Sequence, residues 1–226
     1  MNEERMILAQ LSDIQKQGSE VWLINVYKGF PISFPAKIRS VSDDSALLSV
    51  HRYQTVCIRS SRLTYIKNIH LKQPVKAEVT SLDLDYNLAV LKYFQYTSTT
   101  IGNRETIRVE PDHPTSVQIS NGIISKGELI NISIHGVGMY LDQASFAPRA
   151  FGVGQKVDLI VRLYPEREVF LKGVVRNVIS DEVNIRYRLG IRTFPDANAE
   201  VLLSHFIAQR QVKILREIKS MLGENE

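Results

Sequence analysis

The chain of 226 residues contains one cysteine, Cys57, and no uninterrupted apolar run of the roughly 18 residues that a membrane-spanning helix needs. A single cysteine excludes a disulfide framework and a multi-cysteine zinc site within one chain. Cys57 lies in the apolar segment 55–59, which is typical of a short β-strand, so we expect a buried and unreactive thiol. The charged N-terminus is followed by no apolar signal-peptide core, and we therefore expect a cytoplasmic protein.

The charged residues show only a small excess of positive charge. Lys and Arg number 28 against 24 Asp and Glu, which gives a formal charge of +4, and the basic residues do not form a block. This balance suits an anionic ligand or partner, but it is not typical of a polybasic nucleic-acid-binding tail. Phe and Tyr also do not alternate with Lys and Arg along one strand, as stacking platforms require. We therefore predict no nucleic-acid partner, although a nucleic-acid-binding pair of small barrels is a competing hypothesis.

The sequence lacks the patterns that are typical of enzymes. The five histidines have no metal-ligand spacing, and no phosphate-binding loop or dinucleotide fingerprint occurs. Asp83 and Asp85 precede Tyr-Asn in a predicted hairpin, which favours a turn over a metal site. We predict no enzyme activity, no catalytic residue, no metal and no cofactor. A flavin-dependent enzyme on the N-terminal half is the catalytic alternative.

Short apolar segments separated by turn signals predict a mostly β protein with two small antiparallel barrels, a short N-terminal helix and a long C-terminal helix. The first barrel is expected to be split-barrel-like, and the second is expected to have six strands. The predicted helices cover residues 3–17 and 196–222. The predicted strands cover residues 20–27, 31–41, 46–50, 55–59, 63–67, 75–82, 87–94, 115–120, 123–132, 137–141, 156–163, 168–178 and 183–192.

A polar, hydroxyl-rich stretch at residues 96–103 has no periodicity and predicts a linker. We therefore expect an N-terminal barrel domain at residues 1–96, a linker at 97–108, and a second domain with the C-terminal helix at 109–226. The helix carries an apolar stripe that we expect to pack on the barrel, while Arg210 is placed off that stripe. Self-association into a homodimer through the stripe is the alternative. The stripe consists of Leu203, Ile207, Ile214, Ile218 and Met221.

Two polar motifs follow the linker. The first is an arginine pair, Arg104 and Arg108. Their guanidinium groups can form bidentate hydrogen bonds with a phosphate or with the O6 and N7 edge of guanine. The second is a compact turn in which Asn131 offers an amide to a base edge and Ser133 offers a hydroxyl. Gly136 has no side chain, so a ligand can approach the backbone closely there. Asn, Ser and Gly also favour a plain β-turn, which is the structural alternative.

The two motifs, in this order and spacing, resemble the PilZ family. Its signature is RxxxR in the segment that enters a barrel, followed about twenty to thirty residues later by (D/N)xSxxG. The resemblance continues at Gly152 and Gly154 and in the segments 170–175 and 187–191. The N-terminal half, with Tyr27-Lys-Gly and its short strands, looks like the additional barrel that precedes PilZ in flagellar-brake (YcgR-like) proteins.

The resemblance implies a bacterial effector that binds cyclic di-GMP. In such a protein, Arg104 and Arg108 would bind guanine and phosphate. Asn131 and Ser133 would meet a guanine edge, and Gly136 would permit close approach. Binding would change the domain arrangement and the contacts with a protein partner, such as the flagellar motor, and so control motility, exopolysaccharide or virulence. Asn131 stands where the family often has Asp, and Asn103 stands where some members have another arginine, which leaves the number of bound ligands open. A PilZ-like adaptor that binds proteins without nucleotide is the alternative.

Overall fold

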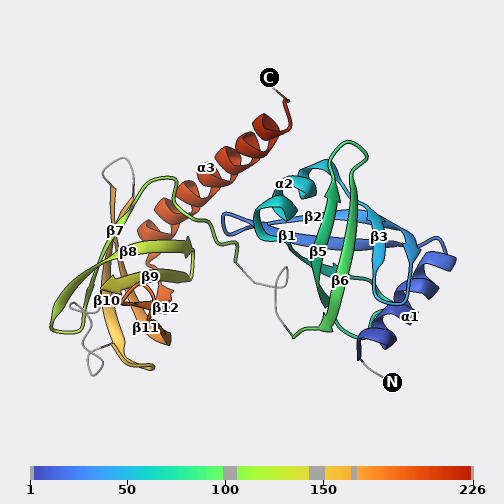
Figure 1. Ribbon diagram of the computed structural model, residues 1–226. Coiled ribbons are helices and arrows are strands. Elements are labelled where there is room, and N and C mark those ends of the chain that lie inside the picture. Colours follow the sequence, from blue (N-terminus) through green and yellow to red (C-terminus); the bar gives the residue numbers. More distant parts are fainter. Residues whose placement is uncertain (1–2, 99–105, 143–150, 164–166, 225–226) are drawn as a thin grey trace. The chain divides into compact units, whose positions relative to one another are not determined.

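The computed structural model describes residues 3–98, 106–142, 151–163 and 167–224 (Figure 1). The chain divides into two compact units, and each contains one closed antiparallel barrel of six strands. The mostly β fold with two small barrels, a short N-terminal helix and a long C-terminal helix is therefore confirmed. The first unit comprises Met1–Tyr27, Pro31–Arg104 and Ile214–Glu226, and the second comprises Lys28–Phe30 and Glu105–Lys213.

The barrel of the first unit has the strand order β1-β2-β3-β6-β5-β4. Its strands are β1 (Glu20–Tyr27), β2 (Phe30–Val41), β3 (Ala46–Ser49), β4 (Leu63–Lys67), β5 (Val75–Asp83) and β6 (Leu88–Tyr96). Alternate residues of these strands point inward, so that side chains such as Leu23, Leu48 and Leu91 are completely buried in one apolar core.

The N-terminal helix α1 (Glu3–Lys16) packs on this barrel, as the apolar face of the sequence predicts. Ile7, Leu11 and Ile14 are buried in the same core as the strands. The first turn of α1 also binds the backbone of β6, because a Glu4 carboxylate oxygen accepts from the Phe94 N–H at 3.1 Å. A helix thus covers part of the barrel and completes its core.

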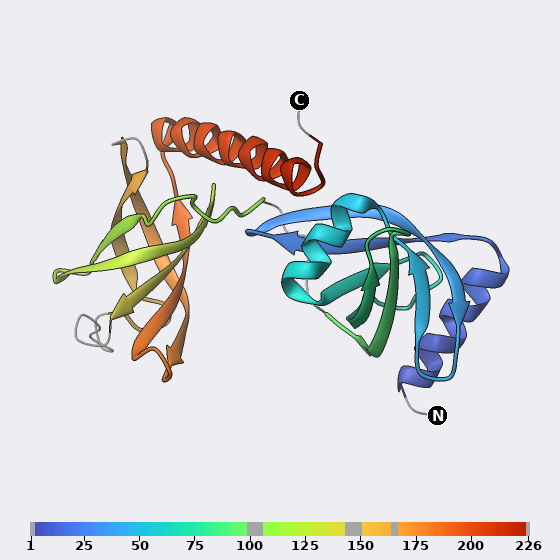
Figure 2. The ribbon, with the colours of Figure 1, turned by 45° about the horizontal axis from the view of Figure 1, so that its top comes forward.

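One predicted strand is wrong. The segment 55–59 lies in the helix α2 (Arg52–Ser61), which contacts β1 (Figure 2). The helix begins where the His51 side chain accepts from the Tyr53 N–H, and it ends where Arg62 adopts a left-handed conformation with φ of 57°. Its Gln54 amide is buried and donates to the Leu23 carbonyl at 2.7 Å. These caps and the tertiary contact outweigh the β propensity of Thr55 and its apolar neighbours.

The barrel of the second unit has the strand order β10-β11-β12-β9-β8-β7. The bounds of the first four strands lie within one residue of the predicted ones, whereas the turn between β11 and β12 lies three residues later than predicted. The strands are β7 (Ser116–Ser120), β8 (Ile124–Ser133), β9 (Gly136–Asp142), β10 (Lys156–Leu163), β11 (Arg167–Asp181) and β12 (Arg186–Phe194). Leu129, Met139 and Leu189 belong to its buried interior.

The C-terminal helix α3 (Ala197–Met221) begins at the predicted cap, where the Asp196 carboxylate accepts from the Ala199 N–H at 2.8 Å. Leu203 and Ile207 are buried, as the apolar stripe predicts, whereas Met221 is exposed. The placement of Arg210 off the buried face is wrong, because this residue is only 2% exposed and its guanidinium donates to the Glu110 carbonyl at 2.7 Å. A long side chain can bury its stem while its head satisfies a backbone acceptor.

Part of the predicted organisation is not tested by these observations. Residues 99–105, which include most of the predicted linker, lie outside the described residues, and the predicted domain limits stay a prediction. Within the described ranges, no helix combines the length and the apolar character required to cross a bilayer.

We predict that Cys57 of the native protein does not react with alkylating agents at neutral pH. The side chain is completely buried, and this burial raises the pKa of the thiol to about 12, so that almost no thiolate forms. Mass spectrometry after iodoacetamide treatment should show an unmodified native protein and one modification in denaturant. Complete modification of the native protein within minutes would contradict the buried position.

Candidate ligand-binding site

The polar turn predicted from the sequence is a hairpin between β8 and β9. Ser133 pairs with Gly136 across the turn, and the Ser133 hydroxyl, which is 1% exposed, donates to the Gly136 carbonyl at 3.4 Å. A Cβ at position 136 would lie 3.2 Å from the same hydroxyl, so a larger residue there would press on Ser133. The Thr193 N–H of β12 donates to the His135 carbonyl at 3.1 Å and anchors the turn to the barrel. The hairpin is therefore a fixed element.

Asn131 lies two residues before Ser133, directly after an irregularity in the pairing of β8 with β9. It pairs with Gly138, and a Cβ at position 138 would lie 2.8 Å from the Asn131 side-chain oxygen. The amide therefore extends over the glycine backbone. Gly138 is not among the residues predicted from the sequence, although the glycine spacing at 136 and 138 is visible there.

The segment that carries the second arginine of the predicted pair joins the barrel beside this hairpin. Val109 and Ile132 form an antiparallel bridge with two backbone N–H···O bonds of 2.9 Å, and both side chains are completely buried. In an antiparallel bridge, the residue before one partner lies next to the residue after the other partner. Arg108 is therefore placed next to Ser133, with its own side chain exposed to solvent.

The structure thus brings together four of the five predicted ligand-binding residues. Asn131, Ser133 and Gly136 share one hairpin, and the backbone of Arg108 lies beside it. Arg104 lies outside the described residues. No observation here tests contact with a ligand, so the roles of these residues stay predictions.

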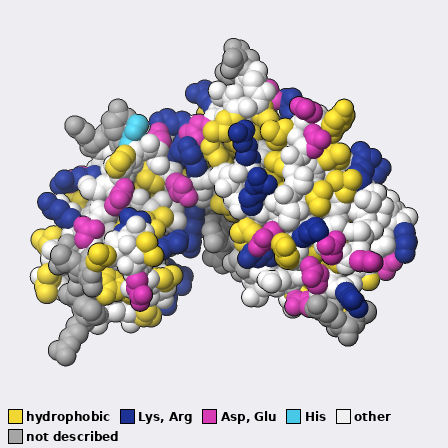
Figure 3. Space-filling view, in the orientation of Figure 1, with side chains coloured by type: hydrophobic (Ala, Val, Ile, Leu, Met, Phe, Trp, Pro, Cys, Tyr) yellow, Lys and Arg dark blue, Asp and Glu magenta, His cyan; other side chains and the backbone are white. Residues whose placement is uncertain are grey.

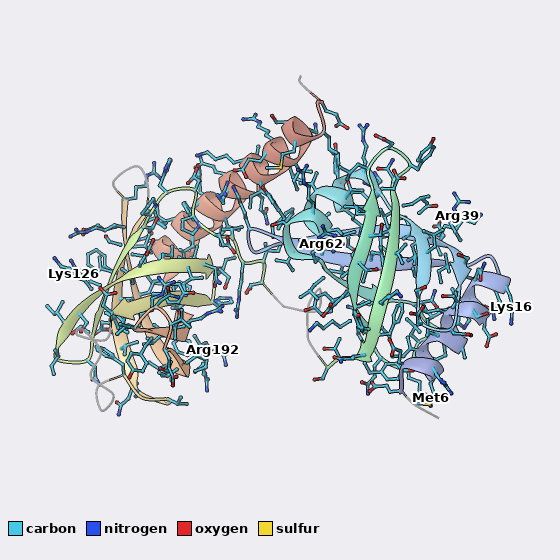
Figure 4. All side chains as sticks on the ribbon, in the orientation of Figure 1. Met6, Lys16, Arg39, Arg62, Lys126 and Arg192 are labelled. Atoms are coloured by element: carbon cyan, nitrogen blue, oxygen red, sulfur yellow. The ribbon has the colours of Figure 1, made fainter. Side chains whose placement is uncertain are left out.

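The neighbouring strand β12 adds positive charge that the sequence analysis did not identify. Arg192 pairs with Gly136, and Arg188 pairs with Tyr140 of β9. Both arginines are exposed on the outer face, and Arg186 stacks over the Tyr140 ring at 3.6 Å from its centroid. Figure 4 shows Arg192 and Lys126 on opposite sides of this barrel, and Lys and Arg side chains gather along the side of Arg192 in Figure 3. An anionic ligand on this hairpin would meet a cationic surface.

The described part of the chain offers no alternative site for metal chemistry. No group of three His, Cys, Asp or Glu side chains could hold a metal ion among the described residues. Asp83 forms a turn, as predicted, because its carboxylate accepts from the N–H groups of Asp85 and Tyr86 at 3.0 and 3.1 Å. The hairpin and its basic surroundings are therefore the strongest candidate site.

The hairpin lies within a segment that matches a known domain family. A family model described as PilZ domain matches residues 102–209. An uncharacterized protein of Aquifex aeolicus (strain VF5) is 30% identical over 160 residues, which cover 70% of this chain and 73% of that protein. The MrkH–c-di-GMP complex from K. pneumonia aligns with a TM-score of 0.51 and 14% identity over 95% of this chain and 96% of that chain. YcgR of Escherichia coli in complex with c-di-GMP aligns with a TM-score of 0.48 and 13% identity, over 95% of this chain and 93% of that chain.

We predict that two glycines of this barrel differ strongly in their tolerance of alanine. A Cβ on Gly127 would overlap the Tyr140 backbone carbonyl, whereas a Cβ on Gly138 would meet the end of the Asn131 side chain, which can rotate away. Gly127→Ala should therefore lower the free energy of unfolding by about 3 kcal/mol, and Gly138→Ala by less than about 1 kcal/mol. Urea denaturation measures both values, and equal losses would contradict the described packing.

Proposed function

Because this chain belongs to the PilZ family, we propose that it is an effector protein that binds cyclic di-GMP on the hairpin between β8 and β9. One observation carries the proposal. The Val109–Ile132 bridge fixes the arginine-bearing segment beside the hairpin that holds Asn131 and Ser133. In the sequence, 22 residues lie between Arg108 and Asn131, yet the two motifs are neighbours in the barrel.

The residue types at this site match the chemistry of a guanine nucleotide. The Arg108 guanidinium, together with that of Arg104, would bind phosphate or the O6 and N7 edge of guanine. The Asn131 amide can donate to O6 and accept from a ring N–H, while its extended position over Gly138 keeps it at the surface of the sheet. In this proposal Gly136, which is buried like Ser133, places no side chain between that hydroxyl and the ligand, and the Ser133 hydroxyl exchanges its bond to the Gly136 carbonyl for the ligand.

The output of binding would be a change in protein contacts and not a chemical reaction. Residues 97–108 join the two barrels in the sequence, and the bound ligand would recruit both arginines of this segment to the second barrel. The ligand would thereby favour one arrangement of the two domains over another, as any conformational switch requires. In this proposal a protein partner in the cytoplasm recognises the changed surface and regulates motility, exopolysaccharide or virulence.

We predict that the protein binds cyclic di-GMP and that Arg108→Ala weakens binding at least tenfold, because a charge-assisted contact with the ligand is lost. Arg104→Ala should have a comparable effect. Isothermal titration calorimetry measures both affinities. Lys126→Ala is the matched control, since it removes a cation from the opposite side of the same barrel (Figure 4).

The outcomes separate the proposal from its alternatives. No binding by the intact protein, or equal affinity in Arg108→Ala and Lys126→Ala, would reject this site. Capture of a protein partner that is indifferent to cyclic di-GMP would favour a nucleotide-independent adaptor.

A second prediction concerns the residue that departs from the common family pattern. Asn131→Asp should bind cyclic di-GMP more tightly than the natural protein, by about threefold to tenfold, because a carboxylate accepts stronger hydrogen bonds from guanine N–H groups than a neutral amide does. The same titration measures the change. Weaker binding by Asn131→Asp would show that the amide N–H of Asn131 is the group that the ligand requires.

A further inference from the structure

The outer face of the second barrel carries a row of four residues that continues from Asn131. Asn131 on β8 pairs with Gly138 on β9, Gly138 pairs with Gly190 on β12, and Gly190 pairs with Asn177 on β11. The row therefore reads Asn-Gly-Gly-Asn across four neighbouring strands. Directly paired residues share a face of the sheet, so all four lie on the same side.

The two ends of the row have the same local structure. A register shift in β8 lies between Leu129 and Asn131, and a register shift in β11 lies between Val175 and Asn177. A Cβ on Gly138 would lie 2.8 Å from the Asn131 oxygen, and a Cβ on Gly190 would overlap the Asn177 oxygen. Each asparagine thus follows a bulge, and each amide lies over the glycine beside it.

This equivalence has a geometric cause. The strands β9 and β12 are antiparallel, so the pair Gly138–Gly190 lies on a local two-fold axis perpendicular to the sheet. The axis relates β8 to β11, which flank the two central strands, and it relates Asn131 to Asn177. Measured along the curved barrel wall, three strand spacings of about 4.8 Å, or about 14 Å, separate the two backbones, and both side chains extend over the glycines between them.

The polar groups of the row are available for a ligand. Neither Asn131 nor Asn177 has a side-chain hydrogen bond to another residue that the structure describes, and Asn177 is exposed. Arg188 and Arg192 lie two residues before and after Gly190 on the same outer face. The row therefore follows the curved outer wall of the closed barrel, presents one amide at each end and is bordered by cationic side chains.

We propose that Asn177 is a further ligand-contacting residue, which hydrogen-bonds to the second guanine of the same cyclic di-GMP molecule whose first guanine meets Asn131. The inference rests on the proposed function and extends it. Cyclic di-GMP consists of two identical nucleotides, and a ligand with two equivalent halves fits a surface with two equivalent amides. Each amide offers an N–H donor and an oxygen acceptor to the O6 and N–H groups of a guanine edge. The glycines leave room for the planar bases because no side chain rises between the amides.

The test is a double-mutant cycle with cyclic di-GMP as the titrant. Asn131→Ala and Asn177→Ala should each weaken binding about tenfold, which is typical of losing an amide–base contact. Since the two residues meet different bases and do not touch, the double variant should bind about a hundredfold more weakly than the natural protein. Gln118→Ala removes an amide from β7 at a position that pairs with Lys126, five residues before Asn131 on β8, and this variant should bind like the natural protein.

Three outcomes decide the inference. Additive losses, with an unchanged midpoint of thermal unfolding, support two separate amide contacts. An Asn177→Ala variant with natural affinity, or a double variant no weaker than Asn131→Ala, overturns the role of Asn177 while the proposed function stands. If the natural protein itself binds no cyclic di-GMP, the proposed function fails, and the role of Asn177 fails with it.

Discussion

The candidate site depends on one backbone interaction, the antiparallel bridge between Val109 and Ile132. Its two hydrogen bonds of 2.9 Å join a segment without regular secondary structure to the end of β8, and both side chains are completely buried. Each such bond contributes about 1 kcal/mol net, and the burial of two aliphatic side chains adds to this. The segment that follows the arginine pair is therefore fixed to the barrel at Val109. The backbone of Arg108 cannot move far from Ser133 unless these contacts break.

Glycines determine how the site presents its polar groups. Because Gly136 has no Cβ, the Ser133 hydroxyl fits beside it. For the same reason, the amides of Asn131 and Asn177 lie over Gly138 and Gly190. Because these glycines lie on neighbouring strands, no side chain stands between the two amides on the outer face beside the arginines of β12. The inward-facing side chains of the same strands are apolar and buried, so the barrel core supports this outer face.

Much of this arrangement follows from the sequence, and the exceptions have physical causes. Alternation of apolar residues and turn signals predicts both barrels, and α1 and α3 follow from their caps and apolar faces. The residue propensities around Thr55 predict a strand, whereas a cap at His51 and contacts with β1 make the segment helical. The spacing of Asn131, Ser133 and Gly136 is local and therefore visible in the sequence. The pairing of β12 with β9 and β11 places Asn177 and Arg192 on the same outer face as that hairpin, and such register between distant segments cannot be read from one sequence.

The central claim is that one ligand touches the entering segment and the β8–β9 hairpin together. Backbone amide chemical shifts during a titration with cyclic di-GMP test it most directly, because they report both elements in one experiment. We predict that the largest shifts fall on residues 106–110 and 131–138, in the same concentration range, with small shifts on β7 and β10. Shifts confined to the strands of the first barrel, or shifts of the hairpin without the entering segment, would contradict the account.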